Sequence, residues 1–346
     1  AAGYPAEGHV DWTAVFGEYL AALPAGFNSI SAADLNAKMA DVAPFILDIR
    51  EAGELSDATN GGYLTGAVNI PVRDVLKNLD KLPAQDQAIV VLCASGHRGG
   101  FVTAALKLLG YTNVRNLAGG LGAWTKASLA VVKGEKPAEP KTGTAPKIAS
   151  NALFKALDAF LSGLPEGFLA TSATAFNEML ASGKKPYILD IRREDEFKTG
   201  YVAGAVNLPM EKLFASLDKL PAKDTQIIIY CVSGHRASVT QAGLKLLGYT
   251  NIVNLGGGIN AWKAAALPLS GVVDWSATWG SFLGGLPADF FSISPANLNV
   301  ALADAAKAPF LLDVREMSEV EKDGFIKGSV VIPVKTVLKP LDKLPA

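Results

Sequence analysis

Short apolar runs alternate with longer helical stretches along most of this chain. Residues 45–49 and 88–92 are two such runs, and each is followed by turn residues and a helical pattern. Strands that are apolar on both faces are typical of parallel sheets covered by helices on both sides. Residues 100–109 and 238–247 are predicted as helices. The pattern therefore predicts an α/β architecture with a parallel sheet.

The same pattern returns along the chain and divides it into three long repeats. Leu-Asp-Ile-Arg at 47–50 recurs at 189–192 and, as Leu-Asp-Val-Arg, at 312–315. An apolar segment ending in Leu-Pro precedes each copy, and Leu-Asp-Lys-Leu-Pro-Ala follows it. Repeats of this length are domains rather than solenoid units. We predict domain 1 at 9–130, a Pro- and Lys-rich linker at 131–147, domain 2 at 148–267 and part of domain 3 at 272–346.

The third repeat stops before the segment that carries a cysteine in the other two. A truncated α/β domain would expose a large apolar face, which soluble proteins avoid. We therefore expect the chain to continue beyond Ala346, so that the sequence is a fragment. The alternative is that a protein partner completes domain 3.

Composition and charge exclude several classes of partner. The net charge is −1 and 49% of the residues are hydrophobic, so nothing indicates binding to nucleic acid or to an anionic membrane. No apolar run is long enough for a membrane-spanning helix. The chain begins Ala1-Ala2-Gly3 without Met, as after removal of a signal peptide. We expect an exported, periplasmic or extracytoplasmic protein. A trimmed N-terminus would look the same and leaves a cytoplasmic location open.

Both cysteines and two of the three histidines lie in one repeated hexapeptide. Cys-Ala-Ser-Gly-His-Arg spans 93–98, and Cys-Val-Ser-Gly-His-Arg spans 231–236. Each copy joins a predicted buried strand to a helix, at the sheet edge where α/β proteins bind ligands. Unpaired N–H groups at a helix N-terminus favour the reactive thiolate. We predict Cys93 and Cys231 as nucleophiles; the alternative is that each is a small buried apolar residue.

The rest of each hexapeptide is predicted to form an anion-binding loop around the sulfur. Glycine lets the loop turn its N–H groups inward, and serine adds a hydroxyl donor. Arginine can make a bidentate hydrogen bond to an oxyanion, or it can hold the loop by bonding backbone carbonyls. The histidines are expected at the rim, facing solvent or a partner, with acid–base catalysis as the alternative. These loop residues are Ala94, Ser95, Gly96, His97 and Arg98, and Val232, Ser233, Gly234, His235 and Arg236.

Each cysteine belongs to a different repeat, so we expect free thiols rather than a disulfide. Two Cys and two His divided between two domains also make a zinc site improbable. The sequence indicates no metal and no cofactor.

The Asp-x-Arg pairs are expected to be mainly structural and to reach the wall of the site. Their arginines are predicted to pair with a glutamate four residues later, such as Glu54 after Arg50. The pairs are Asp48 with Arg50, and Asp190 with Arg192.

These segments together resemble the rhodanese family of sulfurtransferases. The resemblance rests on Leu-Asp-Ile-Arg, Gly-Ala-Val-Asn-Ile-Pro at 66–71, a strand ending in Cys-x-Ser-Gly-x-Arg, and Gly-Gly-x-x-Ala-Trp at 119–124. They follow this order in both complete repeats. The resemblance implies a five-stranded parallel sheet flanked by helices in each domain, and sulfur transfer through persulfides on Cys93 and Cys231.

The resemblance also bears on substrates. Related sulfur-transferring proteins have six residues from Cys to Arg, as here, whereas related phosphatases have one more. Many members carry a basic residue directly after the cysteine, where this chain has Ala94 and Val232. We therefore expect weak use of thiosulfate, and polysulfide or a protein persulfide as the sulfur donor. The acceptor is expected to be a thiol or cyanide. The alternative function is a non-catalytic scaffold or docking subunit of a larger envelope-associated complex.

Overall fold

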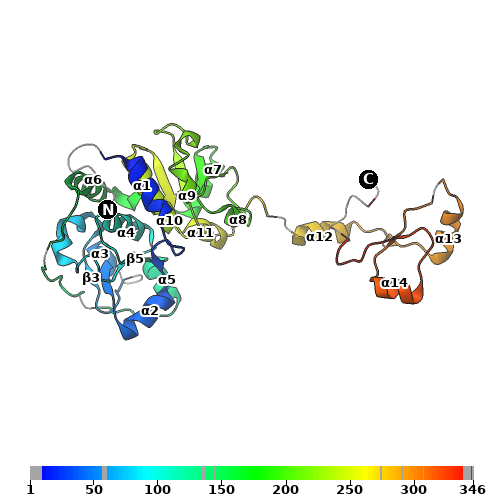
Figure 1. Cartoon of the computed structure of the whole chain (residues 1–346), viewed down its shortest axis with the longest axis horizontal. Helices are drawn as coiled ribbons and strands as arrows, with labels where there is room; N and C mark the ends of the chain where they lie inside the picture. Colours follow the sequence, from blue (N-terminus) through cyan, green and yellow to red (C-terminus); the bar gives the residue numbers. More distant parts are fainter. Residues whose placement is uncertain are drawn as a thin grey trace. The chain divides into compact units, whose positions relative to one another are not determined.

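The computed structural model describes residues 10–56, 61–134, 137–143, 145–272, 275–289, 291–306, 308–337 and 344. Ala1–Gly3 and most of the third Leu-Asp-Lys-Leu-Pro-Ala segment lie outside these residues. The described chain forms two compact units, residues 1–272 and 273–346 (Figure 1). The first unit contains the first two repeats and therefore both cysteines.

The first repeat forms one five-stranded sheet with the order β1-β5-β4-β2-β3. All of its strand pairs are parallel, as the apolar runs predicted. The cysteine loop follows β4, in the middle of the sheet. The elements are α1 (Trp12–Ala21), β1 (Ser29–Ile30), α2 (Ala32–Asp41), β2 (Phe45–Asp48), α3 (Ala52–Leu55), β3 (Val68–Asn69), the 3₁₀ helices η1 (Val72–Asp74) and η2 (Leu76–Lys81), β4 (Ile89–Leu92), α4 (His97–Leu108), β5 (Val114–Leu117) and α5 (Gly120–Lys126).

The second repeat copies this topology with the order β6-β10-β9-β7-β8. Its strand pairs are also parallel. The elements are α6 (Asn151–Ser162), η3 (Glu166–Leu169), β6 (Ala170–Thr171), α7 (Ala173–Ala181), β7 (Tyr187–Asp190), α8 (Glu194–Phe197), β8 (Val206–Asn207), α9 (Met210–Leu213), η4 (Leu217–Lys219), β9 (Ile227–Tyr230), α10 (His235–Leu246), β10 (Ile252–Leu255) and α11 (Gly258–Ala264).

Successive residues of the central strands bury their side chains on opposite faces of each sheet. In the first repeat, Ile46 and Val90 pack under α2 and α5, whereas Leu47 and Val91 face the second repeat. One large apolar cluster contains residues from both repeats, and each repeat has a smaller cluster of its own on the far face. The two repeats therefore share a continuous core.

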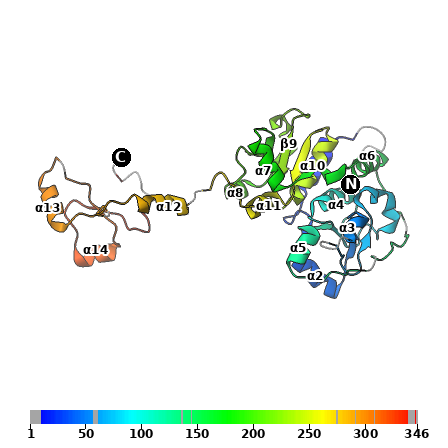
Figure 2. The same ribbon diagram turned by 180° about the vertical axis from the view of Figure 1, so that it is seen from behind.

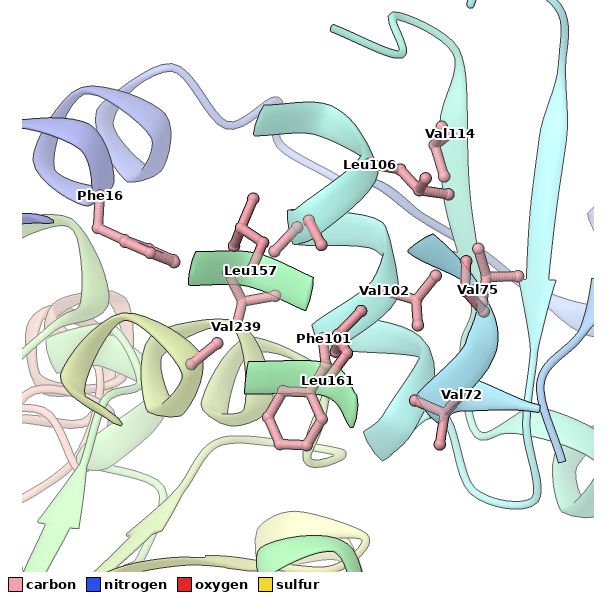
Figure 3. Close-up of a cluster of buried hydrophobic side chains, with 14 of the residues drawn as sticks. Phe16, Val72, Val75, Phe101, Val102, Leu106, Val114, Leu157, Leu161 and Val239 are labelled. Carbon is pink, nitrogen blue, oxygen red and sulfur yellow. The ribbon is translucent and has the colours of Figure 1, made fainter. Parts of the chain in front are cut away.

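The first helix of each repeat packs on the other repeat. Helix α1 contacts α9 and α10, and α6 contacts η1, η2 and α4. Figure 1 shows α1 beside the second repeat, and Figure 2 shows α6 beside α4. The ring of Phe16 stacks on Phe214 with centroids 5.6 Å apart. Figure 3 shows Leu157 and Leu161 of α6 in one cluster with Phe101.

The second unit contains α12 (Trp275–Gly284), α13 (Pro295–Ala303), β11 (Leu312–Asp313), α14 (Met317–Asp323) and β12 (Val330–Val331). Strands β11 and β12 pair in parallel, as β2 and β3 do in the first repeat. Trp279 and Leu283 on α12 are 55% and 58% exposed. The matching residues Phe16 and Leu20 of α1 are buried. The exposed apolar surface expected for the third repeat is therefore present.

The structure provides no candidate for a membrane span. In the part of the chain that it describes, no helix is both long and apolar enough to cross a bilayer.

Candidate active site

Each cysteine lies at the carboxyl end of a central strand, directly before the helix that its loop begins. Cys93 follows β4 and precedes α4, and Cys231 follows β9 and precedes α10. The helices start at His97 and His235, three residues earlier than the sequence pattern indicated. Histidine and arginine thus belong to the first helical turn. Both thiols are free and buried, with 0% and 1% exposure.

The backbone N–H groups of the loop point at the sulfur, as predicted. Gly96 N lies 3.1 Å and Gly99 N 3.4 Å from Cys93 Sγ. In the second loop, Gly234 N lies 3.2 Å from Cys231 Sγ. Gly96 and Gly234 adopt φ of +83° and +90°, a left-handed conformation that glycine tolerates without strain. The two loops therefore present N–H donors to where a thiolate or persulfide charge would lie.

The Gly-Gly-x-x-Ala-Trp motif supports the loop from behind. Leu121 N donates to Cys93 O at 2.8 Å, and Gly122 N donates to Ala94 O at 3.0 Å. A Cβ on Gly120 would lie 2.3 Å from Cys93 O, so only glycine permits this approach. The equivalent Gly258 meets Cys231 O in the same way. Trp124 is buried, as expected for a core residue.

The arginine of each loop pairs with a carboxylate in the same repeat. Arg98 makes two hydrogen bonds of 2.6 Å to Glu54, and Arg236 makes two of 2.8 Å to Glu196. Burial would raise the pKa of Glu54, but the hydrogen bonds and charge of Arg98 outweigh it and lower that pKa. The arginines therefore lock the loops through a carboxylate, where a backbone carbonyl had been expected.

This pairing corrects the prediction that Glu54 binds Arg50. Arg50 instead binds Asp48, through Nη2–Oδ2 at 2.6 Å, and donates to Gly62 O at 2.7 Å. Asp48 ends β2 two residues before Arg50, and its carboxylate lies within reach of the Arg50 side chain at the strand end. Both Asp48 and Arg50 are buried, and Asp48 also accepts from Arg50 N at 3.1 Å. Asp190 and Arg192 repeat the arrangement. A structural role fits these four residues.

The histidines do not face solvent. His97 and His235 are each 4% exposed and point into the other repeat. His97 Nε2 lies 2.7 Å from Phe168 O, and His235 Nε2 lies 2.7 Å from Phe27 O. Burial lowers the pKa of His97 to about 4, the Phe168 carbonyl opposes this shift, and the Arg98 charge adds to it. Burial likewise lowers the pKa of His235. Both rings are therefore neutral at pH 7.

Residues of the opposite repeat also cover the loop arginines. The guanidinium carbon of Arg98 lies 4.5 Å from the ring centroid of Phe168, and that of Arg236 lies 4.7 Å from Phe27. Phe27 and Phe168 both have φ of +51°, which bulky residues adopt only where packing holds them. Ala94 and Ser95 remain exposed above the buried thiol. Val232 and Ser233 of the second loop are partly buried. The first loop is therefore the more open of the two at its outer rim, while both arginines are enclosed.

Several residues near the loops were missed from the sequence. Asn116 and Asn254 are fully buried and bond to the loops. A signal existed, because each asparagine precedes the last leucine of its strand and occurs at the same place in both repeats. Gly99 was missed as an N–H donor because the helix was expected to start later. The phenylalanines could not be assigned, since their partners lie in the other repeat.

Comparison with known protein families agrees with the fold. A model of the rhodanese-like domain family matches residues 31–127 and 172–265, which is more than half of the chain. The chain therefore belongs to the rhodanese family.

Relatives of this chain include proteins named as sulfurtransferases. A sulfurtransferase of Allochromatium vinosum is 35% identical over 95 residues, covering 28% of this chain and 88% of the relative. The chloroplastic thiosulfate sulfurtransferase 16 of Arabidopsis thaliana is 29% identical over 110 residues, covering 29% and 90%.

Solved structures of rhodanese proteins are also similar. A rhodanese-related protein from Thermoplasma volcanium is 26% identical, with 30% of this chain and 98% of that chain covered and a TM-score of 0.27. A thiosulfate sulfurtransferase from Pseudomonas aeruginosa is 21% identical, with 91% and 59% covered and a TM-score of 0.28. The family assignment rests on the family model and on the curated relatives.

Proposed function

We propose that this protein is a sulfurtransferase that carries sulfane sulfur as a persulfide on Cys93 and on Cys231. The observation that carries the proposal is the set of backbone N–H groups around Cys93 Sγ, at 3.1 and 3.4 Å. N–H groups at a helix N-terminus stabilise a thiolate, and a terminal persulfide carries the same charge. Sulfurtransferases among the relatives support the same reaction class.

The reaction divides into two balanced steps. The cysteine thiolate attacks the sulfane sulfur of the donor, and the bond between that sulfur and the rest of the donor breaks. The leaving group departs with the electron pair, as sulfite from thiosulfate or as a shortened chain from a polysulfide. An acceptor thiolate or cyanide then attacks the outer sulfur, and the cysteine leaves as a thiolate again. Neither of these two steps uses a metal ion.

Polysulfide or a protein persulfide fits the loop better than thiosulfate. Ala94 and Val232 offer no positive charge to a sulfonate group. Arg98 and Arg236 are engaged by Glu54 and Glu196, so neither guanidinium is available to a dianion without losing its carboxylate. A polysulfide or persulfide presents a terminal sulfur without a sulfonate group, and the N–H groups can hold that sulfur. The proposed acceptors are a thiol or cyanide.

The test is the intact mass of the reduced protein after incubation with polysulfide or thiosulfate. We expect an added sulfur on each cysteine with polysulfide, and less with thiosulfate, and peptide mapping assigns the positions. Cys93→Ser and Cys231→Ser should each remove one adduct. Unchanged mass with every donor would exclude the persulfide route.

The alternative function is a docking module whose cysteine loops catalyse no reaction. Burial of both thiols favours it, because a donor must displace part of the loop to reach Sγ. A chain carrying both Cys→Ser substitutions distinguishes the two functions. A docking module keeps its binding partners in that variant, whereas a sulfurtransferase loses its activity.

A further inference from the structure

A closed set of hydrogen bonds connects the two cysteine loops through the interface between the repeats. It consists of two asparagine–histidine pairs that cross from one repeat to the other. In each pair, the asparagine holds the loop of its own repeat, and the histidine comes from the loop of the other.

Asn116 holds the loop of Cys93. Its Nδ2 donates to Gly96 O at 2.7 Å, and the N–H of the same Gly96 donates to Cys93 Sγ. The second N–H of Asn116 Nδ2 meets Nδ1 of His235 at 2.7 Å. Both neighbours of this amide nitrogen are acceptors, which fixes the orientation of the amide. His235 therefore orients the group that holds Gly96.

The second repeat has the same arrangement with the roles exchanged. Asn254 Nδ2 donates to Gly234 O at 2.9 Å and meets His97 Nδ1 at 2.8 Å. Gly234 N in turn donates to Cys231 Sγ. His97 thus follows Gly96 in the first loop but supports the second loop.

The histidine tautomer follows from these contacts. Nε2 of His97 faces the carbonyl oxygen of Phe168, so Nε2 carries the proton, and Nδ1 is the acceptor that Asn254 needs. The ring is held at both nitrogens by the second repeat. Any displacement of the first loop that moves His97 removes one of the two acceptors of Asn254.

We propose that His97 is a positioning residue for Cys231 and that His235 is a positioning residue for Cys93, so that each loop is held in place by the other. The proposal deepens the proposed function, because it makes the reactivity of one thiol depend on the state of the other. It needs only that each thiol can be modified, and so it can fail or hold independently of sulfur transfer.

The experiment measures alkylation of both cysteines in the full chain with iodoacetamide, followed by peptide mass analysis over time. Both thiols are buried, so the rate reports loop opening. His97→Gln keeps an N–H donor for Phe168 O but removes the acceptor for Asn254. We expect the rate at Cys231 to rise about 2- to 10-fold, the effect of one hydrogen bond, with a smaller change at Cys93.

His97→Asn is the matched variant. Its Oδ1 takes the place of Nδ1 as the acceptor for Asn254, while the donor for Phe168 O is lost. We expect the alkylation rate at Cys231 to return towards that of the chain without a substitution. A purely structural role would predict similar rates in both variants, or a change mainly at Cys93, and either result would overturn the proposal.

A second measurement needs no substitution. In the natural chain, alkylation of the first cysteine displaces its loop and should make the second react faster, so doubly alkylated protein accumulates early. Independent reaction at two fixed rates contradicts the coupling. Sulfur loading measured on protein of the same preparation before alkylation separates this outcome from failure of the sulfurtransferase function. Normal loading with independent alkylation rejects only the coupling.

Discussion

The hydroxyl of Ser238 fills the space that a β-carbon on Gly100 would need. Helices α4 and α10 cross at this point, and the same hydroxyl donates to His235 O at 2.7 Å. The close approach of the two helices therefore depends on a glycine in one repeat and a small side chain in the other. It also brings the first turns of both helices, with their histidines, into the same interface.

Gly100→Ala should separate α4 from α10. The added methyl would also lie 3.1 Å from His235 O, so we expect a loss of about 1–3 kcal/mol in the free energy of unfolding, the usual cost of overpacking. Chemical denaturation measures it. Gly53→Ala is the control, because nothing lies within 4 Å of a Cβ there. The double variant Gly100→Ala with Ser238→Gly should recover stability, and no recovery would contradict the clash.

Phe16→Ala should destabilise the second repeat although Phe16 belongs to the first. Its ring is fully buried and stacks on Phe214. Removal of a buried aromatic side chain typically costs about 3–5 kcal/mol. Hydrogen exchange should show the largest loss of protection in α9 and α10. Val42→Ala, at a side chain that is 77% exposed, should have little effect. Loss of protection confined to the first sheet would contradict the packing of α1 on the second repeat.

Glu54→Gln should speed alkylation at Cys93, with a smaller increase at Cys231 through His97. The variant replaces a carboxylate that receives two hydrogen bonds from buried Arg98, so the first loop opens more easily. Hydrogen bonds to charged groups contribute roughly 1.5–3 kcal/mol, which corresponds to an increase of about 10-fold or more at Cys93. Glu196→Gln is the matched control and should have its larger effect at Cys231. Equal effects at both cysteines would mean that the lock is not local.

Stability should fall as the pH decreases from about 6.5 towards 4. The pKa of His97 in the folded protein is lowered from 6.5 to about 4, so the unfolded chain binds the proton more readily in this window. The contribution of neutral His97 to the free energy of unfolding is complete above pH 6.5. It decreases by about 1.4 kcal/mol per pH unit as the pH falls through this window, and it changes no further below pH 4.

Comparison with His97→Gln isolates this effect from that of the carboxyl groups. The difference in unfolding free energy between the natural chain and the variant should shrink on acidification. A difference that stays constant between pH 7 and pH 4 would contradict a buried neutral histidine.

The sequence was sufficient for the fold because strand and helix patterns are local. The apolar runs at β2 and β4 and the repeated motifs led directly to two parallel sheets with a cysteine at the centre of each. The direction of the loop N–H groups also followed from Gly96 and Gly234, since the required backbone conformation is a property of the residue itself.

Contacts between the repeats could not be read in the same way. His97 looked like a rim residue because its partners, Phe168 and Asn254, are remote in sequence. Arg50 and Glu54 had the spacing of a helical ion pair, but the strand end offered Asp48 at closer range. The domain boundaries, the compartment, and the donor and acceptor stay predictions.

The first helix of each repeat packs on the other repeat, and this also constrains when the protein can fold. Helix α1 ends at Ala21, but α9, on which it packs, starts at Met210, about 190 residues later. At roughly 5–20 residues per second, a ribosome needs on the order of 10 to 40 seconds to make that stretch. During this time α1 lacks its docking surface, and the surface for α6 on the first repeat is also uncovered until α6 emerges. The first repeat therefore cannot complete its native structure during synthesis before the second has been made, and the nascent chain carries exposed apolar surface until then.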